Sequence, residues 1–323
     1  MNTKIKRIGV LTAGGDSPGM NAAIRAVVRS GIFYNLEVWA IERGFAGLME
    51  GKFLSMSLSS VGGILNRGGT ILQTSRSEKF KTSEGLNIAL QRLRDLEIEG
   101  LVAIGGDGTL RGIRDLSALG VKVIGIPATI DNDLSHTDMA IGVDTALNTI
   151  IEAIDKIKDT ASSHRRAFVV EVMGRDSGYL ALMGGIAGGV EVVLIPEKSY
   201  DPLEISKKIR EGYQRGKTHC IIIIAEGVGK TQEVKTYLEE EIGFETRVTI
   251  LGHLQRGGSP SAFDRILASR LGEAAVKLLL KGETRKMVGL VGNQIESTDL
   301  ETVLSQPKTI SQELYDLALV LAK

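Results

Sequence analysis

Short polar segments rich in glycine and aspartate recur along the chain, and their residue types suit phosphate chemistry. Gly14-Gly15 stands directly before a helical pattern, so backbone N–H groups there could point at a phosphate with no Cβ in the way. The alternative reading is an ordinary tight turn. The segment 105–109 (GGDGT) adds one carboxylate to a similar cradle, and this combination suits a phosphate together with Mg²⁺.

A more specific signal is the segment 129–133, which reads TIDND. In an extended register Asp131 and Asp133 share a side, and two nearby carboxylates repel each other unless a cation or a reacting hydroxyl uses them. An Asx turn that caps a helix is the alternative. We favour catalysis, because one aspartate beside a sugar hydroxyl can act as a general base, which is what a kinase requires of its protein.

Arginines interrupt the same glycine-rich segments, where a phosphate could gather them through bidentate hydrogen bonds. Each of them alone would be expected to be a solvated surface residue. The set comprises Arg76, Arg166, Arg175, Arg247 and Arg256. The histidines lack metal-ligand spacing, and with a single cysteine the chain offers no zinc site.

Several function classes are disfavoured. The segment 227–231 ends like a Walker A loop, but Ile224 occupies the position that needs the first glycine. The chain contains no G-x-G-x-x-G fingerprint, so a Rossmann dinucleotide site is disfavoured. Lys+Arg and Asp+Glu both number 39, so the formal net charge is zero, and a nucleic-acid partner is not expected.

The elements that must position these residues alternate between short apolar runs and longer helical patterns, which predicts α/β architecture with largely parallel sheets. Strands are expected at 8–11, 37–41, 101–104, 121–126, 168–172, 192–195, 220–225, 248–251 and 288–291. Helices are expected at 21–34, 85–96, 145–159, 203–215 and 264–281. The polar segments follow the strands, and ligands of open α/β sheets bind at the carboxyl ends of strands. Cys220 lies in an apolar run and is expected to be buried.

Taken together, these residues resemble the bacterial ATP-dependent 6-phosphofructokinases. The resemblance covers nearly the whole chain in the family's order. It rests on GVLTAGGDSPGMNAAIRAVVR, NRGGTILQTSR, GGDGT, PATIDND, DTASSHRRAFVVEVMGR, AEGVG and ETRVTILGHLQRGGSPSAFDRILASRLG. GGDGT alone is shared with lipid and NAD kinases, whereas the combination of TIDND, MGR and GH-x-QRGG is specific.

The resemblance implies two three-layer α/β domains with the active site in the cleft between them. The ATP-binding domain would span 1–142 and 255–305, and the fructose-6-phosphate-binding domain would span 143–254 and 306–323. It also implies a homotetramer in which the sugar phosphate is shared between subunits. The reaction would be transfer of the γ-phosphate of ATP to the C1 hydroxyl of fructose 6-phosphate, the committed step of glycolysis.

Site residues carried over from the family fall into two active-site groups. The ATP site would comprise Gly15, Arg76, Ser77, Gly106, Asp107, Gly108 and Thr109, with Asp107 as the Mg²⁺-associated carboxylate. Asp131 would be the base, with Thr129 and Arg175 as its catalytic companions. The sugar-phosphate site would comprise Thr129, Ile130, Asp131, Met173, Gly174, Arg175, Glu226, His253 and Arg256, with Arg166 and Arg247 reaching a neighbouring subunit.

A second, allosteric site is also implied, for ADP or phosphoenolpyruvate. Arg25 and Arg29, four apart on one helix, share a face, and a solvated basic stripe is the alternative reading. The matching positions are Arg25, Arg29, Lys158, Glu191, Arg215, Lys217 and His219. Some members have arginine at the position of Leu58 and aspartate at that of Gly63, so effector affinity or choice is expected to differ.

The phosphoryl donor depends on two small residues. Pyrophosphate-using relatives tend to carry lysine at the position of Ala128, where glycine is usual in ATP users, and aspartate at that of Gly108. Small uncharged residues at both positions favour ATP. The rivals are a pyrophosphate-dependent enzyme and a catalytically inactive sugar-phosphate sensor. No signal-peptide core or membrane-length apolar run occurs in the chain, so we expect a cytoplasmic protein.

Overall fold

The computed structural model describes residues 5–164, 166–217, 219–243 and 245–322. The chain divides into two compact units, each built on its own sheet. Unit 1 comprises Met1–Thr129, Leu134–Thr145 and Arg256–Lys308, and unit 2 comprises Ile130–Asp133, Ala146–Gln255 and Thr309–Lys323. The predicted α/β class with largely parallel sheets is confirmed.

Within the described residues, unit 1 contains a seven-stranded sheet in the order β11-β10-β5-β4-β1-β2-β3. Its strands are β1 (Arg7–Thr12), β2 (Glu37–Ile41), β3 (Phe53–Met56), β4 (Gly100–Gly105), β5 (Lys122–Pro127), β10 (Lys286–Val291) and β11 (Gln294–Asp299). The central pairs are parallel, while β3 and β11 close the two edges in antiparallel fashion. Both edge strands were missing from the sequence prediction, because half or more of their side chains are exposed and neither forms a long apolar run.

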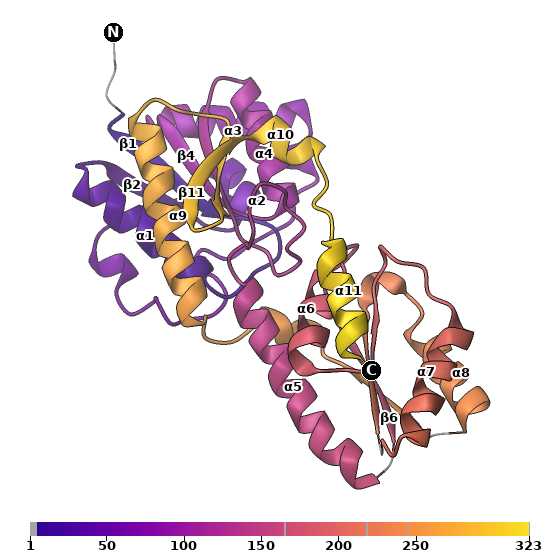
Figure 1. Cartoon of the computed structure of the whole chain (residues 1–323). Helices are drawn as coiled ribbons and strands as arrows, with labels where there is room; N and C mark the ends of the chain where they lie inside the picture. Colours follow the sequence, from indigo (N-terminus) through magenta and orange to yellow (C-terminus); the bar gives the residue numbers. More distant parts are fainter. Residues whose placement is uncertain (1–4, 165, 218, 244, 323) are drawn as a thin grey trace. The chain divides into compact units, whose positions relative to one another are not determined.

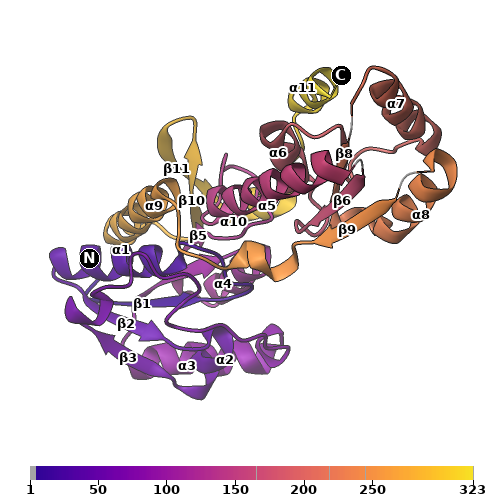
Figure 2. The same cartoon turned by 90° about the horizontal axis from the view of Figure 1, so that it is seen from below.

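Helices cover both faces of the unit 1 sheet (Figures 1 and 2). One face carries α1 (Met20–Phe33) and α9 (Ala262–Leu280), which pack on each other. The opposite face carries α2 (Gly44–Glu50), α3 (Ser83–Asp95), α4 (Asp107–Ala118) and α10 (Leu300–Ser305). The three layers predicted for this part of the chain are therefore present.

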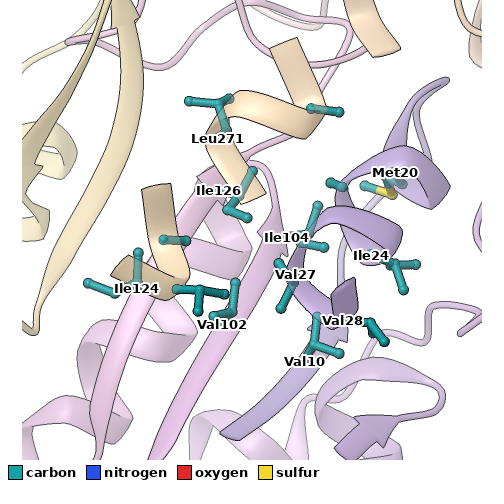
Figure 3. Packing of buried hydrophobic residues seen from close by; sticks show 14 of the residues in the cluster. Val10, Met20, Ile24, Val27, Val28, Val102, Ile104, Ile124, Ile126 and Leu271 are labelled. Carbon is teal, nitrogen blue, oxygen red and sulfur yellow. The ribbon is translucent and has the colours of Figure 1, made fainter. Parts of the chain in front are cut away.

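The core under α1 and α9 consists of branched aliphatic side chains from strand and helix (Figure 3). Val10 of β1, Val102 of β4 and Ile124 of β5 meet Ile24 of α1 and Leu271 of α9. These strands are covered on both faces, which explains their unbroken apolar sequence. The rigid middle of this sheet fixes the carboxyl ends of β1, β4 and β5, where the polar loops begin.

Unit 2 contains, among the described residues, a parallel four-stranded sheet in the order β7-β8-β6-β9. Its strands are β6 (Ala167–Val172), β7 (Val192–Leu194), β8 (Cys220–Ala225) and β9 (Thr246–Ile250), and its helices are α5 (Val143–His164), α6 (Tyr179–Gly188), α7 (Pro202–Gln214), α8 (Thr231–Ile242) and α11 (Gln312–Leu321). Strand β8 is buried throughout, and its Cys220 is 2% exposed, as predicted. No helix in the described ranges has the length and apolar character needed to cross a membrane.

Candidate functional site

The loops that follow β1 and β4 are packed together too tightly for larger residues. A Cβ on Gly105 would lie 2.3 Å from Thr109 Oγ1 and 2.4 Å from the Ala13 carbonyl oxygen. The buried Thr109 hydroxyl donates a 2.9 Å hydrogen bond to that same Ala13 oxygen. Gly14, next in the first loop, has a φ of +83°, which favours glycine. Thr109 therefore braces the two predicted phosphate loops against each other.

Helix α4 begins at Asp107, directly after the second loop, with Gly106 as its N-cap residue. A carboxylate in the first turn is stabilised by the helix dipole. Asp107 Oδ2 accepts a 3.0 Å hydrogen bond from Arg111 Nε, and its side chain is 37% exposed. The Cβ position of Gly108 has no heavy atom within 4 Å. This end of the loop is therefore open to a ligand and carries one reachable carboxylate.

Arg256 lies against the first glycine loop. Its Nη1 donates a 3.1 Å hydrogen bond to the Asp16 carbonyl oxygen and would stand 2.6 Å from a Cβ on Gly15. The sequence analysis assigned Arg256 to the sugar-phosphate site, and this binding role stays a prediction. Arg76 is exposed, while Ser77 Oγ accepts a 3.2 Å hydrogen bond from the Phe80 N–H at the start of the short helix η2 (Lys79–Lys81).

The segment that leads to Asp131 is fixed by backbone pairing on two sides. The Ala128 N–H donates to the Gly105 oxygen at 3.0 Å, and the Thr129 N–H donates to the Ile141 oxygen at 3.1 Å. Ala128 and Ile130 are fully buried, and Thr129 is nearly so. A Cβ on Gly106 would be 3.5 Å from Thr129 Cβ, so the second phosphate loop and this segment are neighbours.

Asp131 forms an ion pair with Arg175 within unit 2. Asp131 Oδ2 lies 3.4 Å from Arg175 Nε, and the aspartate side chain is 3% exposed whereas the arginine side chain is 53% exposed. A buried carboxylate needs such compensation, because removing an isolated charge from water is costly. The exposed guanidinium lies at the surface, where it can also meet a ligand. The structure thus brings together two of the three predicted catalytic residues.

The loop that carries Arg175 is held by Glu226. The Gly174 and Arg175 N–H groups both donate to Glu226 Oε1, at 3.1 and 2.7 Å. Arg175 has a φ of 53°, uncommon for a residue with a side chain, and a Cβ on Gly174 would lie 2.3 Å from the Ser177 oxygen. A Cβ on Gly227 would lie 2.1 Å from the Arg175 oxygen. Gly174, Arg175 and Glu226 therefore form one fixed cluster, and their role in binding the sugar phosphate stays a prediction.

Gln255 and Glu245 also belong to this part of unit 2, and sequence reasoning missed both. The fully buried Gln255 accepts a 3.3 Å hydrogen bond from the Met173 N–H and donates to the Gly252 oxygen at 3.0 Å. The sequence clue to Gln255 was its position between two predicted site residues, the exposed His253 and Arg256. Glu245 pairs with both of the predicted arginines, Arg166 at 2.8 Å and Arg247 at close range. An acid two residues before Arg247 was the available signal.

Most of the chain is similar to proteins of one known family. A family model described as phosphofructokinase matches residues 7–279, which is most of the chain. This chain belongs to the phosphofructokinase family. A curated ATP-dependent 6-phosphofructokinase of Halothermothrix orenii is 54% identical over 331 residues, covering 98% of this chain and all of that protein. One of Bacillus pumilus is 55% identical over 314 residues, covering 97% of this chain and 98% of that protein.

A solved member of the family has the same fold. The phosphofructokinase structure from Saccharomyces cerevisiae superposes with a TM-score of 0.88 at 39% identity, covering 98% of this chain. This chain spans about half the length of that yeast chain, 48%. Membership of the family therefore accounts for the fold.

Four of the family's predicted effector residues gather in unit 2. Glu191, Arg215, Lys217 and His219 line one small cavity between β7, β8 and the end of α7. Glu191 Oε1 accepts a 3.3 Å bond from Lys217 Nζ, and Oε2 accepts a 2.8 Å bond from the Ile221 N–H. Lys158, on α5, has its Nζ 3.4 Å from the Cβ position of Gly189.

The other two predicted effector residues belong to unit 1. Arg25 is half-buried and Arg29 is exposed on α1. Arg29 lines a surface hollow together with Phe33 and Leu58, so the position where some members of the family have arginine is apolar here. Across the described ranges no group of three or more His, Cys, Asp or Glu side chains could hold a metal ion.

Proposed function

We propose that this chain transfers the γ-phosphoryl group of ATP to the C1 hydroxyl of fructose 6-phosphate, giving fructose 1,6-bisphosphate and ADP in the committed step of glycolysis. The observation that carries the proposal is the buried Asp131 carboxylate paired with the exposed Arg175 guanidinium. Curated relatives above 50% identity bear the name of this activity. This pairing of an acid and a cation suits proton removal beside a transferring phosphoryl group.

Asp131 acts as the general base and accepts the proton of the C1 hydroxyl as that oxygen attacks the γ-phosphorus. Arg175 Nε, 3.4 Å from Asp131 Oδ2, is placed to meet the charge that develops on the transferring group. Thr129 completes the catalytic set. Its backbone N–H is bonded to Ile141, so the residue is fixed directly before Ile130 and the base.

The nucleotide is held by the two glycine loops, through Gly15 and residues 106–109, with Arg76 and Ser77 at their side. One carboxylate, Asp107, stands at the helix start beside the open space at Gly108. Mg²⁺ is commonly bound by one or two carboxylates and the phosphates of its nucleotide, so a single aspartate fits an ion carried by ATP. When bound, the ion neutralises phosphate charge.

Fructose 6-phosphate is bound by the loop 173–175, with Glu226 accepting sugar hydroxyls and His253 and Arg256 facing the 6-phosphate. Arg166 and Arg247 serve the site of a neighbouring subunit in a homotetramer. Both now share Glu245, and exposed ion pairs of this kind exchange readily for a phosphate. Mixing inactive Asp131→Asn chains with Arg166→Ala chains should restore part of the activity in hybrids. Verified hybrids without recovery would count against a shared site.

The donor is assigned to ATP because the position of Gly108 is open and that of Ala128 is small and buried. A coupled assay with fructose 6-phosphate and either ATP or pyrophosphate tests this assignment. We expect turnover with ATP and little with pyrophosphate. The reverse result would establish the pyrophosphate-dependent alternative, and binding of fructose 6-phosphate without turnover would establish a sensor. The sensor is disfavoured because the chain retains the proposed ATP-site and catalytic residues Arg76, Asp107, Asp131 and Arg175.

Regulation by ADP or phosphoenolpyruvate is part of the proposal. The cavity lined by Glu191, Arg215, Lys217 and His219 supplies cations for phosphate and one acid that could face the Mg²⁺ of a diphosphate. We expect ADP to lower, and phosphoenolpyruvate to raise, the half-saturating fructose 6-phosphate concentration, with couplings of roughly 5–150-fold. Titrations of the wild type and of Arg25→Ala measure this. If neither effector shifts the half-saturating concentration of the wild type, the proposed effector site is wrong. It is also wrong if Arg25→Ala leaves such a shift intact.

A further inference from the structure

We propose that Asp264 is a positioning residue for the transfer reaction. Its buried carboxylate accepts hydrogen bonds from segment 142–145. Ile141, directly before this segment, contacts both the first glycine loop and the residues that lead to Asp131. The inference rests on the proposed function. Asp264 lies in the first turn of α9, is fully buried, and appears in none of the site assignments made above.

The carboxylate of Asp264 is saturated by one short segment. Oδ1 accepts a 2.8 Å hydrogen bond from the Gly142 N–H. Oδ2 accepts two more from Thr145, at 2.9 Å from the N–H and 2.5 Å from the hydroxyl. The Thr145 hydroxyl in turn accepts a 2.9 Å bond from the N–H of Ser261, the residue that caps α9. The three donors to the Asp264 carboxylate are buried, so this contact leaves segment 142–145 little freedom.

The segment held by Asp264 is the one that pairs with the approach to the base. Ile141, next to Gly142, donates its N–H to the Pro127 oxygen at 3.0 Å and accepts from the Thr129 N–H at 3.1 Å. Ile141 also forms a parallel bridge with Ala128. The chain enters Ile130 and Asp131 directly from this pairing, so a displacement at Gly142 would be passed to the base.

The same segment also touches the first glycine loop. Ser17 Oγ donates a 3.1 Å hydrogen bond to the Ile141 oxygen, and a Cβ on Gly142 would lie 2.6 Å from Ser17 Cβ. A Cβ on Gly19 would lie 2.6 Å from Ile141 Cγ2 and 3.6 Å from Asp264 Cβ. One carboxylate therefore sets the register between two loops to which the proposed function gives different roles.

A buried carboxyl group is an unusual choice for stability alone. Burial raises the pKa of Asp264, and the hydrogen bonds from Thr145 and Gly142 oppose that shift. A neutral acceptor could also bond to one N–H, but only a carboxylate accepts from all three donors in this arrangement. The geometry thus points to a residue kept for the placement it enforces.

Steady-state kinetics of Asp264→Asn test the proposal. The new amide keeps one oxygen and presents N–H groups to the Thr145 donors, so the segment has to shift. We expect kcat to fall by about 10- to 100-fold while the KM values for ATP and fructose 6-phosphate change by less than about threefold. Ser261→Ala is the matched control: it removes the cap at the same helix start but leaves the carboxylate in place, so it should lower the melting temperature and leave kcat unchanged.

Thr145→Val and Thr145→Ser keep the test decisive if Asp264→Asn fails to fold. Valine removes the hydroxyl donor and should lower kcat, whereas serine restores the hydroxyl and should restore kcat. Wild-type kcat in Asp264→Asn, or equal kcat in the valine and serine variants, would overturn the positioning role and leave the proposed function standing. A wild-type chain that does not phosphorylate fructose 6-phosphate would overturn the proposed function, and this inference with it.

Discussion

The two glycine-rich regions of the molecule are held in shape by different forces. In unit 1 the loops after β1 and β4 are fixed by contact, since a Cβ on Gly105 would stand within 2.4 Å of two neighbouring oxygens. In unit 2 the loop 173–175 is fixed by a charged side chain, because Glu226 accepts from two successive N–H groups. Its basic neighbours are likewise paired with acids, as Arg175 with Asp131 and Arg247 with Glu245.

This difference suits the two proposed ligands. A loop set by steric contact keeps its shape whether or not a nucleotide is present, so it suits recognition of phosphates through backbone N–H groups. In unit 2 an exposed ion pair such as Arg247–Glu245 can exchange its internal partner for a charged ligand at modest cost, because exposed ion pairs contribute little to stability. The comparison predicts that substitutions in unit 1 act through shape and those in unit 2 through charge.

Removal of the charge on Asp131 should have the largest effect. Asp131→Asn keeps the size of the side chain but removes the proton acceptor, so we expect kcat to fall by roughly 10²–10⁴-fold. ATP binding, measured by calorimetry, should change much less. Near-normal turnover in this variant would show that the base lies elsewhere and that charge is not decisive in unit 2.

Substitution by alanine should affect stability differently at Gly105 and Gly108, two glycines of the same unit 1 loop. Gly105→Ala forces Thr109 and the Ala13 carbonyl apart, and such overpacking costs about 1–3 kcal/mol. We expect a lower melting temperature and a raised KM for ATP, the latter because the loop shape is lost. Gly108→Ala, with open space around it, is the control and should not lower the melting temperature, because alanine forms helix better than glycine. Equal melting temperatures for both variants would contradict the steric account.

Changes at Glu245 and its arginine should shift substrate affinity in opposite directions. Arg247→Ala should raise the half-saturating fructose 6-phosphate concentration far more than that of ATP. Glu245→Gln frees Arg166 and Arg247 from their acid and should lower the same concentration by about 1.4- to 5-fold, the range given by an exposed ion pair of 0.2–1 kcal/mol. A weaker affinity in Glu245→Gln would mean that the acid positions the arginines instead of competing with the substrate.

The last prediction concerns a titratable group in the core of unit 2, away from its charged loops. Burial raises the pKa of the Cys220 thiol above its ordinary value of 9.0, so the thiol stays neutral in the folded chain while the unfolded chain ionises. The free energy of unfolding should therefore fall as pH rises above about 9, by at most about 1.4 kcal/mol per pH unit. Denaturant titrations should show a shallower fall in Cys220→Ala. Identical slopes would place the thiol in contact with water.

Much of the fold was predictable because buried parallel strands have a distinctive sequence. Each expected strand, from 8–11 to 288–291, corresponds to an observed one within a few residues. Strands β3 and β11 escaped prediction because edge strands with exposed faces carry no such run. Helix α6 was also not predicted. It is apolar and rich in small residues, so no polar face reveals its helical periodicity.

The sequence drew attention to candidate site residues that stand in short motifs, and not to residues that hold distant backbone in place. Asp131, Arg175 and Glu226 stand in short motifs, and the structure places them in one cluster. Gln255 and Asp264 do their work by accepting hydrogen bonds from backbone that is distant in sequence. No local pattern encodes such contacts, because they depend on which loops the fold brings together.

The left-handed backbone at Arg175 has a consequence for anyone who would engineer this protein. An arginine in that conformation stores strain of order 1–3 kcal/mol, and Asn132, with a φ of 49° beside the base, shares the positive φ at a lower cost, because asparagine adopts it more readily. Glycine at either position would relax the chain. Selection for heat resistance alone would thus favour substitutions at these two positions. Such substitutions would remove the Arg175 guanidinium or make the backbone beside Asp131 more flexible. Variants from such a selection should therefore be tested for turnover at every round.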